Sequence, residues 1–450
     1  MSRKALKLAE INQAVNFDEP IGPDHSFFTD FSMVRGDFEE QIVYANLNVD
    51  IDGERLTFDP SINGQNKILF FLGGMRGSGK TSELQKYAKK LHHPDCFFCV
   101  TCNIDDELDL NNLEYMDIVV FQLEKLTESL RDQNIDINQG ALKSLEKWFA
   151  ETVVEVNRNI SGEAAIEIGG EAEAGGFWSI LKIFGSLKAG MKGSIERATS
   201  VRTALKNRFD DFASQFNRFV EEANVAIRER NAGQEVLFIV DGLEKTMTAE
   251  TRRKVILDES NRIRQLNAYM LFTLPIELMK ERQKLGQLAF VETFPFVKLI
   301  EKNGQRRPES IEKFREFVYR RIDKSLFENE NLVDEAICYG GGSPRELLKI
   351  LKTANVVADR AQGVITRTAL DKALHRLANQ TAQFLSPVQW ATIKSVVQNN
   401  RERRGTPFDD TLQDLLERLI LMEYNDGNYK RPNPILELSD AYRENIGTPA

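Results

Sequence analysis

The stretch Gly74-Met75-Arg76-Gly77-Ser78-Gly79-Lys80-Thr81 decides the fold, because it has the G-x-x-x-x-G-K-[ST] spacing of a phosphate-binding loop. A short apolar run at residues 68–72 precedes it and has the length of a buried strand. Apolar residues at helical spacing follow it between residues 82 and 91. This strand–loop–helix context favours a true phosphate loop over a chance glycine-rich turn.

The residue types of this loop suit an anionic ligand. Glycine has no Cβ, so positions 74, 77 and 79 can turn successive backbone N–H groups toward one centre. The positive end of the following helix favours negative charge at the same place. We expect Lys80 to reach the β- and γ-phosphates and the Thr81 hydroxyl to hold Mg²⁺. The residues expected to contact the nucleotide are Gly74, Met75, Arg76, Gly77, Ser78, Gly79, Lys80, Thr81 and Ser82.

Length and composition indicate an ordinary multidomain globular protein. A chain of 450 residues predicts two to four domains, since domains have roughly 100–200 residues each. No apolar run approaches the ~20 residues that span a bilayer, and the N-terminus has no export signal. Four cysteines make no disulfide framework, so we expect a cytoplasmic protein. The net charge of −9 argues against a generally basic nucleic-acid binder but leaves a local basic patch open.

Three cysteines, Cys96, Cys99 and Cys102, resemble a metal motif, and two histidines precede them. The run from 96 to 102 also reads as one buried strand, in which free cysteine behaves as a small hydrophobe. Side chains alternate along a strand, so Cys99 would point away from the other two. The buried strand is therefore the favoured interpretation over a zinc site, which needs four convergent ligands.

A second part of the site is expected at two later strands. Residues 235–241 form an apolar run that ends in Asp241, which fits a buried parallel strand with a metal-holding carboxylate at its end. Glu244 follows closely and is a candidate to polarise the attacking water, with a surface glutamate as the alternative. Residues 268–274 predict another strand, where Thr273 would contact the γ-phosphate or the water. Residues 294–299 are expected to be the last core strand.

Residues 106–230 separate the first two core strands from the strand that ends in Asp241, and so predict an insertion. Apolar residues at steps of 3 and 4 mark helices around 142–153 and 205–223, and the phenylalanines of the second are expected to pack. The glycine-rich segment between them mixes aromatic residues and lysines. Membrane contact through residues 160–193, docking onto a partner and packing on the protein itself all stay open, and self-packing is favoured.

A run of glycines before Ser343, Pro344 and Arg345 marks the start of a helix. Ser343 is a natural N-cap and Pro344 a natural first residue of the helix. Arg345 then lies in the first turn, where a cation opposes the helix dipole. An anion near Arg345 would remove this cost, so a nucleotide contact is favoured over a plain surface arginine.

The loop at 74–81, Asp241, Thr273 and the Gly342-Ser343-Pro344-Arg345 run, in this order, resemble an AAA+ ATPase. The similarity is greatest to the origin-recognition-like and signal-transducing (STAND) branches and covers roughly residues 30–445. It implies ATP as ligand, sensor 1 at Thr273 and a helical lid carrying the sensor-2 arginine, Arg345. Gly242 departs from the family, which often has Glu directly after the aspartate, so slow hydrolysis is expected. Arg282 is a candidate arginine finger.

The resulting expectation is an α/β P-loop fold with a helical insertion, a helical lid and a C-terminal winged-helix domain. We expect an N-terminal segment at 1–64, the ATPase core at 65–300 with its insertion at 106–230, the lid at 301–380 and the winged helix at 381–450. In the last part, Ser386-Pro387 and Thr406-Pro407 are expected to start helices, and residues 419–431 to form a hairpin. Carboxylates dominate the would-be recognition helix, which favours protein contact over DNA.

Two functions follow from the resemblance. The first is an ATP-dependent molecular switch that forms a homo-oligomer or controls a separately encoded effector protein, by analogy in bacterial phage defence. The alternative is a DNA-binding AAA+ ATPase of replication or transposition. The acidic helix counts against the alternative, because DNA phosphates repel carboxylates.

Overall fold

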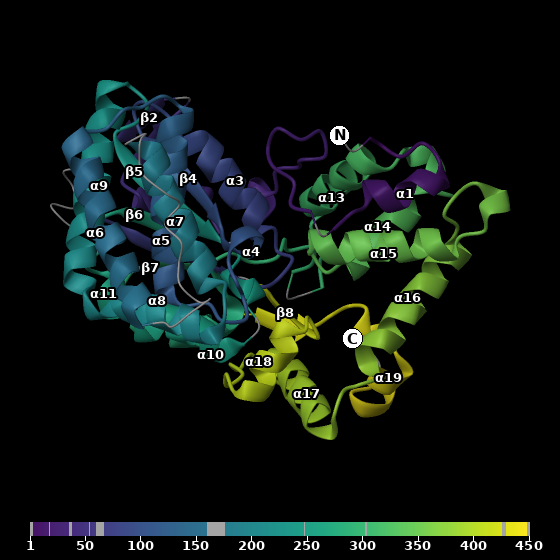
Figure 1. The fold of residues 1–450 in the computed structure, drawn as a ribbon. Coiled ribbons are helices and arrows are strands. Elements are labelled where there is room, and N and C mark those ends of the chain that lie inside the picture. The colour runs from purple at the N-terminus through teal and green to yellow at the C-terminus, as the bar shows by residue number, and fades with distance from the viewer. Residues whose placement is uncertain are drawn as a thin grey trace.

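The computed structural model describes residues 3–17, 19–35, 38–53, 55–59, 67–159, 176–246, 248–301, 304–424 and 429–447. Figure 1 shows three parts: a sheet wrapped in helices, a separate group of helices around α15, and a smaller C-terminal group of helices with a hairpin at β8. The third part lies against the other two.

The central sheet has five parallel strands in the order β4-β5-β6-β3-β7. Its strands are β3 (Leu69–Gly74), β4 (Phe97–Asn103), β5 (Glu235–Asp241), β6 (Tyr269–Pro275) and β7 (Phe290–Thr293). The register sets Asn103 beside Asp241 and Leu72 beside Thr273. The carboxyl ends of all five strands therefore meet at one edge, where ligands bind in such sheets. The predicted parallel α/β fold is confirmed.

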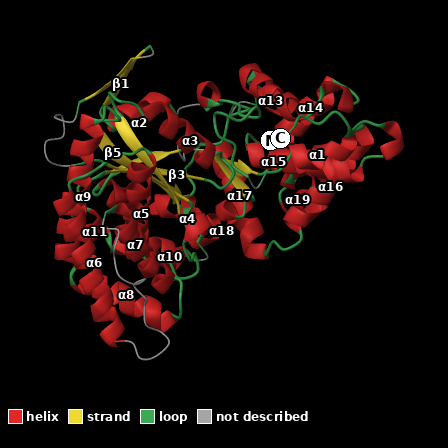
Figure 2. Ribbon diagram, turned by 45° about the horizontal axis from the view of Figure 1, so that its top comes forward, coloured by secondary structure: helices red, strands yellow, loops and turns green. Residues whose placement is uncertain are grey.

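Helices cover both faces of this sheet (Figure 2). Side chains alternate along each strand, so that Phe70 and Leu72 face α3 (Lys80–Leu91) and α2 (Glu40–Asn46), whereas Phe71 faces α5 (Tyr115–Asp132) and α9 (Phe209–Glu229). An antiparallel hairpin of β1 (Val49–Asp52) and β2 (Arg55–Phe58) packs at the α3 side. Both faces are apolar, which explains why the strands are continuous hydrophobic runs.

The expected insertion between β4 and β5 is helical. It contains α4 (Ile104–Glu107), α5, α6 (Gln139–Asn159), α7 (Phe177–Met191), α8 (Ile195–Asn207) and α9. The predicted second helix is divided near Arg208, and its phenylalanine stripe is buried as expected. The apolar face of α7 packs against α5 and α6, with Phe184 5.1 Å from Phe149 between ring centroids.

The apolar face of α7 thus packs on the protein itself, which is the interpretation that the sequence favours for this segment. Residues 160–175, which share the glycine-rich prediction, lie outside the described residues. In the described part of the chain no helix has both the length and the hydropathy to cross a bilayer.

The prediction of a last core strand at residues 294–299 is wrong, since the strand is β7 and ends at Thr293. Pro295 has no N–H to donate to a ladder, so pairing stops there. The Val297 N–H donates instead to Gly342 O at 3.1 Å. This segment thus tethers the sheet to the helical group. The remaining core helices are short: α10 (Ala249–Arg253), α11 (Ser260–Ile263) and α12 (Arg282–Gly286).

The helical unit contains α13 (Pro308–Arg321), α14 (Glu330–Tyr339), α15 (Pro344–Val357) and α16 (Arg367–Ala382). The N-terminal helix α1 (Leu8–Ala14) packs in the core of this unit and contacts α15. The start of the chain therefore belongs to the helical unit, although more than 300 residues separate it from α15 in the sequence. The Ser343 hydroxyl accepts a hydrogen bond from the Glu346 N–H, and Pro344 is the first residue of α15, both as predicted.

The C-terminal unit contains α17 (Pro387–Glu402), α18 (Asp410–Glu417), β8 (Leu421–Tyr424), β9 (Tyr429–Pro432) and α19 (Asp440–Asn445). Ser386 caps α17 as predicted, and the two strands pair as an antiparallel hairpin. The helix start predicted at Thr406-Pro407 is wrong, because α18 begins at Asp410. Asp409 supplies the cap, accepting a hydrogen bond from the Leu412 N–H at 2.7 Å.

Candidate functional site

The loop between β3 and α3 has the geometry of an amide cradle. Gly77 and Gly79 have φ values of +80° and +95°, which only glycine adopts readily. Gly74 is required for a different reason: a Cβ there would lie 2.6 Å from the Phe294 carbonyl oxygen. Backbone approach, rather than positive φ, explains that glycine.

Lys80 is buried at the floor of this loop. Its Nζ donates to Gly74 O at 2.8 Å and to Met75 O at 3.0 Å. An ammonium has three N–H donors, so one remains for an anion over the loop. Ser78 is buried, Arg76 is exposed, and Thr81 and Ser82 are half-buried. The residues expected to contact the phosphates therefore lie on the loop and the first turn of α3, and among them Arg76 is exposed to solvent.

Asp241, Thr273 and Glu244 meet beside the phosphate loop, within reach of Thr81 and Lys80. The Thr273 hydroxyl lies 2.8 Å from Asp241 Oδ1 and 3.4 Å from Glu244 Oε2. They meet because β6 lies between β3 and β5, which brings Thr273 between the loop and Asp241. Asp241 is buried, and its Oδ2 has no hydrogen-bond partner among the described residues.

Burial is the main cause that raises the pKa of Asp241, and the nearby Glu244 carboxylate adds to it. The hydroxyls of Thr81 and Thr273 and the charge of Lys80 act in the opposite direction. A buried carboxylate with an unpartnered oxygen, next to a threonine hydroxyl, fits a hard cation such as Mg²⁺. Thr81 and Asp241 are the residues that would hold it.

The backbone at Gly242 explains why the residue after Asp241 is not a glutamate. Its φ is +100°, and a Cβ there would lie 2.8 Å from Asp105 Oδ1. Glutamate directly after Asp241 would therefore be strained and would collide with the first residues of α4. The chain instead carries its carboxylate on a 3-10 turn, Leu243–Lys245, where Glu244 is half-buried. Lys245 forms an ion pair with Asp105, which fastens this turn to α4.

Arg345 lies against the phosphate loop. A Cβ on Gly77 would be 3.0 Å from the Arg345 Cβ, and the Ser343 hydroxyl donates to Gly77 O at 3.2 Å. Its guanidinium lies 5.6 Å from the centroid of the Phe17 ring. The start of α15 therefore contacts the loop directly, and the role of Arg345 as a nucleotide sensor stays a prediction.

Arg282, the candidate arginine finger, is the first residue of α12 and contacts the neighbouring strand β7. Its Nη2 donates to Val291 O at 3.0 Å and lies 3.7 Å from Glu292. These contacts belong to the edge of the core sheet, and the finger role stays a prediction.

A pocket that no local sequence pattern indicates lies next to the phosphate loop. Its lining combines the N-terminal segment, the first turn of α3 and the helical unit: Ile21, Phe27, Phe28, Thr29, Phe31, Arg35, Gly79, Ser82, Glu83, Phe317, Arg321 and Pro344. Thr29 Oγ1 and Arg35 Nε are buried with no hydrogen-bond partner in the described parts of the chain. A mostly apolar pocket with a few unpaired polar atoms suits an aromatic ligand group.

Arg35 joins this pocket to the loop. Its guanidinium lies 3.8 Å from the Phe294 ring centroid, and its Nη1 donates to Pro295 O at 2.9 Å. Burial lowers its pKa to about 10, and the charge of Glu83 acts in the opposite direction. No spacing rule links Arg35 to residues 74–81, because only the folded chain brings its side chain beside Gly79.

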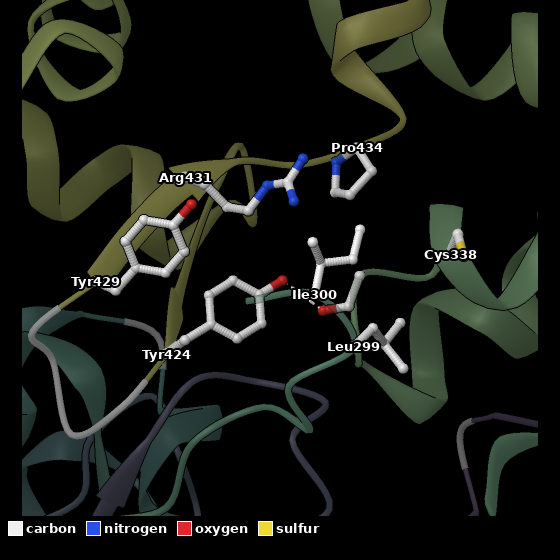
Figure 3. Close-up of a pocket in the computed structure, with 8 residues that line it drawn as sticks. Leu299, Ile300, Cys338, Tyr424, Tyr429, Arg431 and Pro434 are labelled. Carbon is white, nitrogen blue, oxygen red and sulfur yellow. Dashed lines mark hydrogen bonds between the residues drawn. The ribbon is translucent and has the colours of Figure 1, made fainter. Parts of the chain in front are cut away.

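The C-terminal unit also contacts the site. The Glu423 N–H donates to Met75 Sδ at 3.1 Å, and the Tyr424 hydroxyl donates to Gly341 O at 2.5 Å. Figure 3 shows Tyr424, Tyr429 and Arg431 of the hairpin facing Leu299 and Ile300, with Pro434 and Cys338 nearby. This unit thus holds both the phosphate loop and the glycine run that precedes Arg345.

The sequence favours a buried strand over a metal motif for Cys96, Cys99 and Cys102, and β4 covers most of this run. Among the residues that the structure describes, no three His, Cys, Asp or Glu side chains converge as a metal site. Cys96, just before β4, packs in the same cluster as Cys99, and Cys102 packs on the opposite face of the sheet. The expectation that Cys99 points away from Cys102 is confirmed, and the expectation that it points away from Cys96 is wrong, because Cys96 precedes the strand and its alternation. The strand interpretation is confirmed.

Comparison with known proteins gives loose structural likeness only. No family model matches the chain. No curated protein matches it. Among solved structures, it is similar to a Walker-type ATPase of Pyrococcus abyssi at 13% identity and a TM-score of 0.40, over 93% of this chain and 98% of that one. It is also similar to the Drosophila ORC structure bound to DNA, at 13% identity and a TM-score of 0.39, over 95% and 90% of the two chains. Likeness at this level does not bear on the chemistry of the site.

Proposed function

We propose that this chain binds ATP with Mg²⁺ and hydrolyses it slowly, as a molecular switch. The observation that carries the proposal is the unpartnered oxygen of Asp241, which is linked through the Thr273 hydroxyl to Glu244 and lies beside the amide cradle. A buried carboxylate oxygen without a hydrogen-bond partner is costly, and a metal–phosphate ligand would remove that cost.

Each residue then has one task. The amides of the loop and Lys80 bind the β- and γ-phosphates, and Thr81 and Asp241 hold the metal. Mg²⁺, when bound, neutralises charge on the phosphate oxygens. Glu244 accepts a proton from the attacking water, with its carboxylate oriented by the Thr273 hydroxyl. Arg345, in contact with Gly77, reports the phosphates to the helical unit.

The pocket beside Gly79 is assigned to the base. Phe27, Phe31 and Phe317 provide apolar surface, and Thr29 and Arg35 provide the unpaired polar atoms. Adenine as the base rests on the AAA+ resemblance. Slow turnover is supported by Gly242, since the proposed catalytic carboxylate, Glu244, is carried on a 3-10 turn rather than on the residue next to Asp241.

The switch role is supported by the way in which the two smaller units meet the site. The helical unit reaches the loop through Ser343, and the C-terminal unit, proposed to be a winged helix, reaches it through Glu423 and Tyr424. Nucleotide exchange at the loop therefore changes contacts of both units. A homo-oligomer or a separately encoded effector as the output, and a place in phage defence, rest on analogy with STAND-like ATPases.

The acidic helix α18 faces the protein's own core. Lys280 donates to Gln413 Oε1 at 2.8 Å and lies 3.7 Å from Asp410. These contacts support protein packing over DNA binding. A DNA-binding titration against salt tests the alternative, because phosphate contacts give a steep salt slope.

The decisive experiment measures nucleotide binding and turnover in matched variants. We expect Lys80→Ala to lose binding of a fluorescent ATP analogue, and Glu244→Gln to keep binding while turnover falls about 10²–10⁴-fold. Size measurements with ATP, ADP and no nucleotide test the switch. Unchanged hydrolysis in Glu244→Gln would remove Glu244 from the mechanism, and binding by Lys80→Ala equal to wild type would refute the site.

A further inference from the structure

Arg252 reaches the turn that carries Glu244. Its Nη1 donates to Thr246 O at 2.6 Å, directly after the 3-10 turn. Thr246 in turn closes this turn, since its N–H and its hydroxyl both donate to Leu243 O, at 3.3 and 3.0 Å. Arg252 thus holds the end of the turn, and Lys245 with Asp105 holds the other side.

Two carboxylates from different parts of the fold hold Arg252. Glu277, just after β6, pairs with its Nε, and both side chains are almost fully buried. Glu417, at the end of α18 in the C-terminal unit, lies 3.8 Å from its Nη2. The remaining oxygen of Glu417 accepts from Gln413 at 2.7 Å, so the glutamate is oriented toward Arg252.

A buried arginine requires such partners. An ion pair with a half-exposed surface carboxylate stabilises a protein by little, whereas a buried guanidinium that loses a partner is left with uncompensated charge. The planar guanidinium fork of arginine has five N–H donors in fixed directions. A shift of one carboxylate partner of Arg252 therefore also moves the donors that face its other partners. The fork therefore connects Glu417 of α18 with the carbonyl of Thr246.

Resting on the proposed function, we infer that Arg252 is a positioning residue for Glu244, and that Glu417 makes this positioning depend on docking of the C-terminal unit. Glu277 anchors the arginine to the segment that follows Thr273, so the strand-end hydroxyl and the catalytic turn share one support. Docked α18 holds the Glu244 carboxylate close to Thr273. Undocking releases the guanidinium, and the turn loses its fixed distance from the phosphate loop.

The test compares Glu417→Gln with Asp410→Asn in the full-length protein. Both variants remove one negative charge from α18, but Asp410 faces Lys280 and has no contact with Arg252. We expect Glu417→Gln to lower kcat about five- to fiftyfold, which lies within the ordinary range of coupling between two sites. The KM for ATP and the affinity for a fluorescent ATP analogue stay unchanged, and Asp410→Asn behaves as wild type.

Arg252→Lys provides a second variant, which keeps the charge but loses the fork. It should lower kcat about 10²-fold with binding retained, since small misplacement of a catalytic group has that cost. Hydrogen exchange adds a readout that needs no turnover. The amides of Lys245 and Thr246 should exchange faster in Glu417→Gln and Arg252→Lys, and not in Asp410→Asn.

Several results would overturn the inference: kcat unchanged or raised in Glu417→Gln, an equal fall in Asp410→Asn, or a loss that appears in KM rather than kcat. Absence of ATP hydrolysis by the wild-type protein would instead refute the proposed function. In that case the exchange rates of Lys245 and Thr246 alone decide whether Glu417 and Arg252 position the turn.

Discussion

Replacement of Gly242 by alanine tests the strongest local constraint in the site. The residue links Asp241 to the turn that carries Glu244, and its φ is +100°. The added Cβ would lie 2.8 Å from Asp105 Oδ1, 3.2 Å from Ile104 Cγ1 and 3.3 Å from the Asp105 nitrogen. The first atom can swing aside, but the last belongs to the backbone and cannot.

The expected destabilisation follows from these contacts. A side chain in the left-handed region costs about 1–2 kcal/mol. Displacement of the Asp105 carboxylate, which also weakens its ion pair with Lys245, adds about 1 kcal/mol, the low end for overpacking. The sum of about 2–3 kcal/mol corresponds to a melting temperature about 4–12 °C lower for a unit of this size.

Gly185→Ala is the matched control. This glycine lies inside α7, and a Cβ there would meet no heavy atom within 4 Å. Alanine should stabilise the helix by about 0.5–1 kcal/mol, because glycine loses more conformational freedom on folding. Calorimetry of both variants without nucleotide measures the difference.

The outcome also bears on catalysis. Gly242→Ala should lower kcat, since the turn moves away from Asp105 and takes Glu244 with it. A Gly242→Ala protein that melts with the wild type, beside a stabilised Gly185→Ala protein, would refute the requirement for glycine. The explanation for the missing Glu after Asp241 would then fail as well.

Two further predictions concern single hydrogen bonds. Thr273→Val should lower kcat and lower the free energy of unfolding by about 1.5–3 kcal/mol, because the buried Asp241 carboxylate loses its hydroxyl donor. Thr273→Ser keeps the hydroxyl and should match the wild type in ATP turnover and in thermal unfolding. Burial lowers the pKa of His92, whose Nδ1 accepts from the Cys99 N–H at 3.2 Å. The unfolded chain therefore binds a proton at His92 more readily than the folded chain does. The contribution of neutral His92 to the free energy of unfolding is present above about pH 6.5 and is lost as the pH falls below that value. Melting temperatures across that range should fall more steeply for wild type than for His92→Asn, and parallel curves would contradict the prediction.

Much of the site was predictable because its signals are local. The loop spacing, the apolar run ending in Asp241 and the Ser343 cap depend on residues within a few positions of each other, where backbone geometry is set by the local residue types. Thr273 was expected from its place at the end of a strand, and the strand order brings it to Asp241. The strand predicted at residues 294–299 is wrong because Pro295 stops the pairing after β7. The helix start predicted at Thr406 is wrong because Asp409 caps α18 instead.

The sequence by itself determined the parallel sheet, the phosphate loop and the two carboxylates, because period, glycine position and cap chemistry act over short distances. Only the tertiary structure decided that Arg35 lies beside Gly79, that Arg252 supports the Glu244 turn, and that the C-terminal unit covers Met75. These contacts join segments up to hundreds of residues apart, and their formation depends on how the packed units meet. No local pattern specifies how the packed units contact each other. A buried arginine or an exposed carboxylate occurs in many local sequence contexts, so the residues around it in the sequence do not identify its partner.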